Sequence, residues 1–260
     1  MLPSAPRSKF DIVPWNPSFE TGIATIDEQH RCLVNLINDL AHEYVYGAEV
    51  SETERILDAL IDYAAYHFET EEAIWAEILV NDSWYEGHLK THNGFIDAVR
   101  SMQAKLQSDD RRTLIDQLLS FLTGWLAHHI LYEDKRFSLV FLQLREGMDL
   151  GSAKKSAQES MTGQTSGLIQ SVLSMYKELS SRTLALEREA YSRQVAEQAL
   201  LDQEQHWTSV LGASSDSLWD WDLSTLSDRL IAADLFSQTG FTIHPDDWPN
   251  LRQDLISHIL

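Results

Sequence analysis

The sequence predicts a mainly α protein: an up-down four-helix bundle, followed by a long C-terminal linker helix and a small, partial α/β tail. Three observations support this fold class. Within residues 20–140, apolar residues recur every three to four positions in four separate stretches, which is the period of an amphipathic helix. Short polar connections join these stretches, so neighbouring helices should run antiparallel. Small and polar residues then dominate 147–165, before a fifth helical pattern begins.

The first two stretches each place an ionisable group on an apolar helix face. In the first, His30 is in phase with Leu33, Val34, Ile37, Leu40, Ala41 and Tyr44. In the second, His67 and Glu71 are four residues apart, which stacks them on one face. The apolar residues of that face are Leu57, Leu60, Ala64, Ile74 and Ile78. An unpaired charge in such a core is costly, so we expect Glu71 to have a binding partner.

The third and fourth stretches repeat this combination of histidine and apolar face. His88 and His92 are in phase with Phe95, Ile96, Val99, Met102 and Leu106. His129 is in phase with Ile115, Leu118, Leu119, Leu122 and Leu126. His128 is adjacent to His129 but falls on a less apolar face, so periodicity favours His129 as the inward-facing residue.

Residues 166–207 have the alternating spacing of three and four residues that a coiled coil requires. One seam position is occupied by Ile169, Tyr176, Thr183 and Ala190. The other is occupied by Val172, Leu179, Leu186, Leu200 and Trp207, with Arg193 interrupting the pattern. We therefore expect a homodimer formed through this helix. The alternative is a single amphipathic helix packed on its own domain.

The predicted domains are the bundle at 12–148, the linker and coiled-coil helix at 149–208, and the tail at 209–260. The linker prediction rests on the Gly- and Ser-rich composition of 147–165. The tail combines strand-like and turn-like pieces with a final helical pattern. Its length of about fifty residues is marginal for independent folding.

Composition excludes several classes of partner. The net charge of −20 argues against nucleic acid or an anionic membrane surface as the main partner. No run of about 18 apolar residues is present, so we expect no membrane span. The N-terminal stretch lacks the apolar centre of a signal peptide. The single cysteine, Cys32, cannot form an internal disulfide, and a reducing, cytoplasmic location is the natural expectation.

Five in-phase histidines on four helices, together with a carboxylate, predict a metal site inside the bundle. Imidazole and carboxylate ligands suit iron, zinc or manganese. Five imidazoles and two carboxylates exceed the needs of a tetrahedral zinc, and suit two octahedral ions that share bridging carboxylates. With a bridging oxide or hydroxide, these groups fill all but one of the coordination positions. The remaining position would be open to a small exogenous ligand.

Residues 15–137 resemble the hemerythrins, especially the bacterial hemerythrin domains. The resemblance rests on four motifs in order: GIATIDEQH, HFETEE, HLKTH and WLAHHILYEDKRF. It implies a non-heme diiron centre with an oxo or hydroxo bridge, and O2 as the ligand. One iron would be held by His88, His92 and His129, and the other by His30 and His67. The open position would then fall on the two-histidine iron.

The resemblance also implies that Glu71 and Asp134 bridge the two irons. Simple spacing of four residues from His129 would instead select Glu133 as the second carboxylate. Asp134 lies five residues on, about 140° around an ideal α-helix. We follow the resemblance and expect Asp134 to be the bridge.

The tail is similar to the first half of a PAS domain at two places, WDWDL at 219–223 and HPDDW at 244–248. The chain thus resembles an O2 sensor of a bacterial signalling protein, in which a diiron bundle passes oxygen or redox state to a PAS-like or output region. Proteins of this architecture often end in domains for cyclic-di-GMP turnover. The alternatives are an oxygen carrier, which would not need 150–260, and a sensor of nitric oxide or peroxide. The chain has no catalytic motif and no E-x-x-H pair of ferritin-like enzymes, so we do not expect an enzyme.

Overall fold

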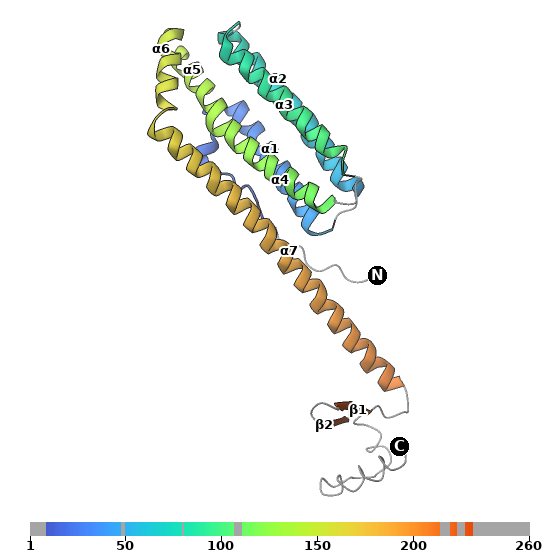
Figure 1. Cartoon of the computed structure of the whole chain (residues 1–260). Helices are drawn as coiled ribbons and strands as arrows, with labels where there is room; N and C mark the ends of the chain where they lie inside the picture. The colour runs from blue at the N-terminus through green and yellow to red at the C-terminus, as the bar shows by residue number, and fades with distance from the viewer. Residues whose placement is uncertain are drawn as a thin grey trace, which may run out of the picture. The chain divides into compact units, whose positions relative to one another are not determined.

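The computed structural model describes residues 9–47, 50–79, 81–106, 111–213, 219–222 and 227–230. It confirms the mainly α fold class, with a four-helix bundle and a long helix (Figure 1). The chain divides into two compact units, Met1–Arg193 and Gln194–Leu260, which are described separately below. Within the described segments, no helix combines the length and the apolar character needed to cross a membrane.

The first unit contains the bundle. After a short 3-10 turn, η1 (Pro17–Phe19), its helices are α1 (Ala24–Val45), α2 (Val50–Leu79), α3 (Ser83–Gln103) and α4 (Arg111–His128). Helix α1 packs on α2 and α4, and α3 packs on the same two helices, which closes the bundle. Helix α4 continues without a break into a π-helix, η2 (His129–Asp134), and then into α5 (Lys135–Arg145).

The turn between α2 and α3 is short. Asn81 reverses the chain direction after α2, and Asp82 caps the start of α3. Asn81 has a φ of 64°, in the left-handed region that asparagine tolerates better than most residues. The Asp82 carboxylate then accepts a hydrogen bond of 2.9 Å from the Trp84 backbone N–H, which caps α3. This turn holds α2 and α3 antiparallel and in contact.

Two separate apolar clusters fill the bundle, with a polar layer between them. The larger cluster includes Leu33, and the smaller one is formed by Ile26, Trp75 and Phe137 together with Leu79. On α1, His30 lies between Ile26 of the small cluster and Leu33 of the large one. Apolar packing above and below therefore fixes the position of the polar layer and keeps water out of it.

The segment expected to be a linker contains a packed helix, α6 (Leu150–Ser160). Ala153 and Ala157 are fully buried against Val140 of α5. Small side chains allow the two helices to approach closely, so residues that were read as part of a linker form an interface. The Asp149 carboxylate caps the helix by accepting a hydrogen bond from the Ser152 backbone N–H.

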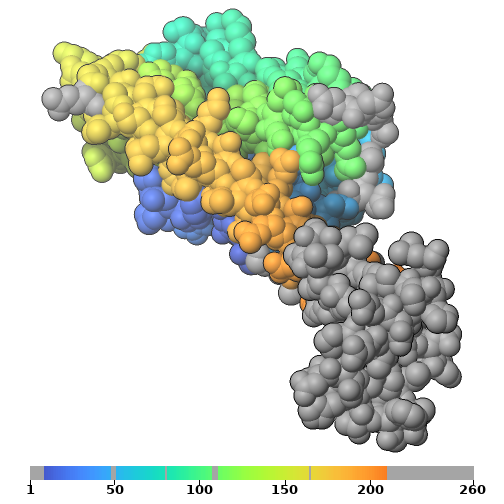
Figure 2. All heavy atoms as spheres, turned by 60° about the horizontal axis from the view of Figure 1, so that its bottom comes forward, coloured from blue at the N-terminus to red at the C-terminus, as the bar shows by residue number. Residues whose placement is uncertain are grey.

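Helix α7 (Gln164–Ala213) has 50 residues and includes the whole of the helix expected at 166–207. Within the first unit, one face of α7 packs on the bundle through Ile169, Tyr176 and Leu184. The Ser180 hydroxyl also donates a hydrogen bond of 2.6 Å to the Ile12 carbonyl. In Figure 2 this part of the helix, yellow to orange, lies along the surface of the bundle. For this face, the alternative of packing on its own domain is the one that the structure adopts.

A neighbouring face of α7 is an apolar surface that the first unit leaves exposed. We call it the exposed α7 stripe: Leu168, Val172, Met175, Leu179 and Leu186, which are 37% to 70% exposed. Its members are separated by four, three, four and seven residues, so they lie along one face of the helix. Ile169 and Tyr176 of one predicted seam position therefore pack on the bundle, whereas Val172, Leu179 and Leu186 of the other are exposed.

In the second unit, two short strands form an antiparallel hairpin, β1 (Trp219–Asp222) and β2 (Ser227–Leu230), with Trp219 opposite Leu230. These strands agree with the strand-like pieces expected there. The HPDDW motif, the final helical pattern and the rest of the PAS-like segment lie outside the described residues. The domain boundaries at 148 and 208 stay predictions.

Candidate metal centre

The polar layer brings together all seven residues predicted for the site. Helix α1 contributes His30, α2 contributes His67 and Glu71, α3 contributes His88 and His92, and the π-helix η2 contributes His129 and Asp134. All seven side chains are buried, with at most 2% of the residue exposed. By contrast, His128 is exposed, as the periodicity predicted.

Glu71 lies at the centre of this layer. Its Oε2 is 3.4 Å from His88 Nε2, 3.5 Å from His92 Nε2 and 3.6 Å from His129 Nε2. Its other oxygen, Oε1, is 3.9 Å from His30 Nε2. One carboxylate therefore faces imidazoles from both sides of the layer, which is the arrangement that a bridging ligand needs.

Asp134 faces the same two sides. Its Oδ2 lies 3.2 Å from His30 Nε2, and its Oδ1 lies 3.2 Å from His129 Nε2. The π-helix explains how it reaches this position. Lys135 N–H donates to the carbonyl of Ile130, five residues earlier, so a spacing of five residues returns to the same face. In an α-helix, Asp134 would be rotated away from His129.

The same geometry excludes Glu133, the residue selected by simple four-residue spacing. Glu133 Oε2 forms an ion pair of 2.9 Å with Arg136 instead of facing the layer. The spacing argument was therefore wrong because the local helix is wider than an α-helix. Single-turn π-helices are rare, and they occur disproportionately at functional sites.

Two polar side chains outside the predicted set orient the histidines. Gln29 Oε1 lies 3.0 Å from His67 Nδ1, and Glu72 Oε1 lies 2.9 Å from His92 Nδ1. Each contact assigns the proton to Nδ1 and leaves the Nε2 lone pair directed into the layer. Sequence periodicity missed both residues. Their only signal was their position next to His30 and Glu71.

Aromatic rings fix two of the imidazoles from the apolar side. Phe68 stacks on His92 at a centroid distance of 3.8 Å and an interplanar angle of 9°. Trp125 stacks on His129 at 4.4 Å and 21°. These contacts restrict ring rotation, so the two imidazoles are held in one orientation before any ion binds.

The donor atoms in the layer fit a metal. Among the residues that the structure describes, no hydrogen-bond partner is present for either nitrogen of His30 and His88, or for either oxygen of Glu71 and Asp134. Buried groups of this kind are costly without a partner, and a cation would satisfy them together. Two groups of four residues have ligand atoms within 4.8 Å of one another: Glu71, His88, His92 and His129, and then His30, His67, Glu71 and Asp134.

Burial also sets the neutral state of the imidazoles that metal binding requires. It lowers the pKa of His30 to about 4 and that of His67 to about 3, so both imidazoles are neutral at neutral pH. Burial opposes ionisation of Glu71, but the surrounding imidazoles, His67 first, hold its pKa well below the usual value. Burial, followed by repulsion from Glu71, raises the pKa of Asp134 well above its usual value.

An antiparallel four-helix bundle with a buried layer of imidazoles and two central carboxylates defines a cation-binding helical bundle. The family described as the hemerythrin HHE cation binding domain matches residues 21–138. A bacteriohemerythrin of Pseudomonas aeruginosa is 32% identical over 123 residues, covering 46% of this chain and 75% of the relative. A bacteriohemerythrin of Clostridium acetobutylicum is 31% identical over 129 residues, covering 47% of this chain and 96% of the relative. A hemerythrin-like protein of Naegleria gruberi is 28% identical over 123 residues, covering 47% and 88%. The chain belongs to the hemerythrin family.

Proposed function

We propose that the bundle holds two non-heme irons and binds O2. The observation that supports this most directly is the pair of four-residue groups that share Glu71. His88, His92 and His129 would hold one iron, and His30 and His67 the other, with Glu71 and Asp134 spanning both. A diiron centre of this composition supplies reversible redox chemistry and an affinity for small ligands such as O2.

The protein's own contribution to ligand binding is asymmetric. One four-residue group contains three imidazoles, and the other contains only His30 and His67. The second group therefore offers fewer imidazole donors to its metal ion. We infer that a small ligand binds on the side of this second group. His30 and His67 are both fully buried, so a ligand there is shielded from bulk water.

Anaerobic reconstitution with Fe(II) tests this proposal. We expect two irons per chain by metal analysis and a change in the visible spectrum on adding O2. The double variant His88→Ala/His129→Ala should lose at least one iron, whereas His128→Ala, at the exposed neighbouring position, should keep both. A single zinc per chain, or full iron content in the double variant, would contradict the diiron proposal.

We further propose that this domain works as a sensor rather than as a carrier. The π-helix that contains His129 and Asp134 continues directly into α5, and short turns then join α5 to α6 and α6 to α7. Helix α7 also packs directly on the bundle through Tyr176 and Leu184. A carrier would need only the bundle, so the docked α7 favours a role in passing on the state of the site. Nitric oxide or peroxide could replace O2 as the signal.

Signalling requires two states that the ligand binds with different affinity. Limited proteolysis between α6 and α7, at Met161–Gly163, can detect such states. Cleavage rates should differ between the anaerobic diferrous protein and the protein exposed to O2. Equal rates would favour the carrier alternative, in which α7 does not respond to the site. The output, including any role in cyclic-di-GMP turnover, is inferred from family resemblance alone.

A further inference from the structure

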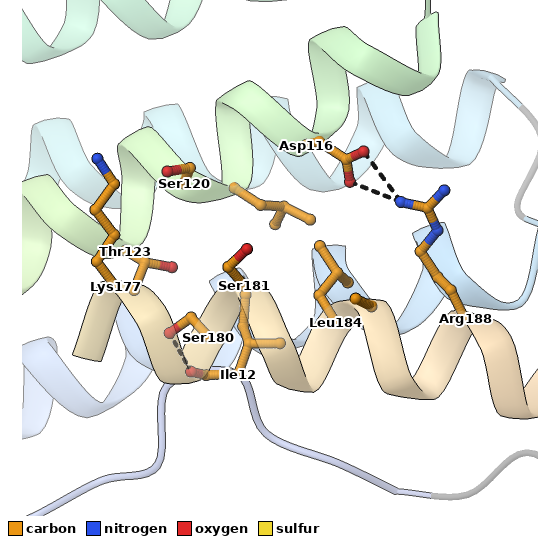
Figure 3. Close-up of a pocket in the computed structure, with 11 residues that line it drawn as sticks. Ile12, Asp116, Ser120, Thr123, Lys177, Ser180, Ser181, Leu184 and Arg188 are labelled. Carbon is orange, nitrogen blue, oxygen red and sulfur yellow. Dashed lines mark hydrogen bonds and ion pairs between the residues drawn. The ribbon is translucent and has the colours of Figure 1, made fainter. Parts of the chain in front are cut away.

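A pocket separate from the metal centre lies between α4 and α7. Figure 3 shows α4 on one side of it and α7 on the other. Its volume is about 220 Å³, and its lining comes from both helices and from Ile12 of the N-terminal segment. Among the lining residues, Thr123 is the nearest in sequence to His129 of the metal centre. The two are six residues apart, or ~9 Å along an α-helix.

Inside this pocket, one buried hydroxyl group has no hydrogen-bond partner among the described residues. Thr123 is 1% exposed, and its Oγ1 neither donates nor accepts a hydrogen bond. Figure 3 shows this hydroxyl projecting from α4 into the space between the helices. A buried hydroxyl without a partner is unfavourable and uncommon in folded proteins. Ser120 and Ser181 add two further hydroxyls to the lining.

The side chains that line the pocket have a net charge of +1, which comes from Lys177. Asp116 is neutralised by Arg188, whose Nη1 lies 3.0 Å and 3.1 Å from its two carboxylate oxygens. Lys177 lines the same pocket and has no carboxylate partner in the part of the chain that the structure describes. Figure 3 shows Lys177 at one end of the pocket and the Asp116–Arg188 pair at the other.

The floor of the pocket is apolar, formed by Ile12, Leu119 and Leu184, which are at most 7% exposed. The lining therefore combines one available positive charge, hydroxyl donors and a hydrocarbon surface. A single positive charge matches a monoanion better than a dianion. The volume is below the range of about 300–1,000 Å³ usual for drug-sized ligands, so only a short molecule fits.

We propose that this pocket binds a short-chain aliphatic monocarboxylate. The carboxylate accepts hydrogen bonds from the Lys177 ammonium and the Thr123 hydroxyl, and the hydrocarbon chain packs on Leu119 and Leu184. The ligand would thereby link α7 to α4 directly. The proposal does not depend on the identity of the metal or on O2 binding.

Isothermal titration of the purified full chain with butyrate tests this site, with inorganic phosphate as the comparison ligand. We expect one butyrate per chain, with affinity in the millimolar range that so few atoms allow, and no saturable binding of phosphate. Lys177→Gln should weaken butyrate binding about tenfold, because a charged hydrogen bond is lost. Lys155→Gln, at an exposed lysine on α6, should leave it unchanged.

Thr123→Val separates a ligand role from a structural one. Replacing the unpartnered hydroxyl with a methyl group of similar size should raise the melting temperature of the butyrate-free protein while weakening butyrate binding. A hydroxyl needed only for folding would give a lower melting temperature. Butyrate binding that survives Lys177→Gln would place the ligand elsewhere, the metal centre included, and would overturn the proposal. Absence of saturable butyrate binding, or equally tight phosphate binding, would overturn it too.

Discussion

Glu133 and Asp134 are adjacent acids in opposite environments. Asp134 points into the bundle, with its two oxygens each 3.2 Å from an imidazole nitrogen. Glu133 points toward Arg136, which neutralises it. A carboxylate with its own arginine needs no further cation, whereas a fully buried carboxylate without a hydrogen-bond donor does.

Removing each acid in turn should therefore give different metal contents. Asp134→Ala should lose iron, because it removes a donor that faces both ligand groups. Glu133→Ala, one residue away, should retain the full content and lose only a weak ion pair. Elemental analysis of both variants after Fe(II) reconstitution checks this, and equal losses would refute the assignment of Asp134.

Glu72 should act through the orientation of His92. Its contact with Nδ1 is expected to be worth about 10- to 100-fold in metal affinity, as is usual for such partners of ligating histidines. Glu72→Ala should lower iron affinity by that factor, and Glu72→Gln, whose amide oxygen still accepts a hydrogen bond, should restore most of it. Glu77→Ala, at an exposed position on the same helix, is the matched control. Competition with a chelator measures the three affinities, and no difference between Glu72→Ala and the control would contradict the role.

The metal-free protein should lose stability as pH falls from about 6.5 to about 4. In this window the unfolded chain binds protons at His30 and His67, whose folded pKa values are about 4 and 3, so the free energy of unfolding decreases as pH falls. For His30 alone the loss is on the order of 3 kcal/mol at pH 4. Asp134, with a raised pKa, works in the opposite direction, but His129 and Glu71 reinforce the loss.

Urea unfolding of chelator-treated protein at pH 7.5, 5.5 and 4.5 measures this dependence. His30→Leu removes one titrating group without opening a large cavity, so it should flatten the pH profile. A profile for the unmodified chain that is level across the window would show that these imidazoles are not buried in the neutral state.

Periodicity was sufficient to predict the inward-facing histidines and Glu71, because each repeats the phase of the apolar residues on its own helix. It could not predict Asp134, because the π-helix rotates the residues after His129 relative to an α-helix, and the pattern of apolar residues gives no sign of this rotation. Only the family resemblance identified that residue. Gln29 and Glu72 were missed for a different reason: their function depends on contacts between helices, which a single-helix pattern does not contain.

At the scale of elements, α6 shows why composition can mislead. A stretch rich in Gly, Ser and Ala is common in linkers, and it is equally suited to close helix packing. Ala153 and Ala157 are four residues apart on one face of α6 and are both fully buried, so the helix docks through its small side chains. The structural order of this segment depends on the absence of larger side chains at these two sites.

A larger side chain at Ala157 should therefore undock α6. Ala157→Leu adds volume to a filled contact and should cost about 1–3 kcal/mol. Lys155→Leu makes a comparable apolar addition on the exposed side of the same helix and should have little effect. Thermal unfolding compares the two variants, and faster proteolysis within 150–160 in Ala157→Leu would locate the change. Equal melting temperatures would mean that α6 contributes nothing to the stability of the first unit.

At the scale of the whole molecule, the exposed α7 stripe is the feature that the first unit does not explain. Five apolar side chains at helical spacing remain in water, while the neighbouring face of the same helix is packed on the bundle. Contiguous apolar surface of this kind indicates an interaction site. The homodimer stays our prediction. Its interface would be the exposed α7 stripe, because part of the heptad seam expected from the sequence is packed on the bundle.

Leu179→Glu should convert the dimer to a monomer, because it buries a charge at the centre of the stripe. Ser174→Glu adds the same charge on the far side of α7 and should leave the dimer intact. Light scattering at micromolar concentration distinguishes the two states, and iron content should be unchanged in both variants. An unmodified chain that is already monomeric under these conditions would refute the dimer.

The π-helix has a consequence for everything that follows it in the chain. Its extra residue sets the rotational phase of α5, so Phe137 and Val140 face the two small apolar clusters only because η2 is wider than an α-helix. Deleting one residue between Ile130 and Glu133 would rotate α5 by about 100° relative to the bundle. Such a deletion would displace Asp134 and turn Phe137 and Val140 out of their contacts together. The π-helix therefore fixes two things together: the position of Asp134 in the site and the packing of α5 on its neighbours. A deletion or insertion in η2 would disturb both.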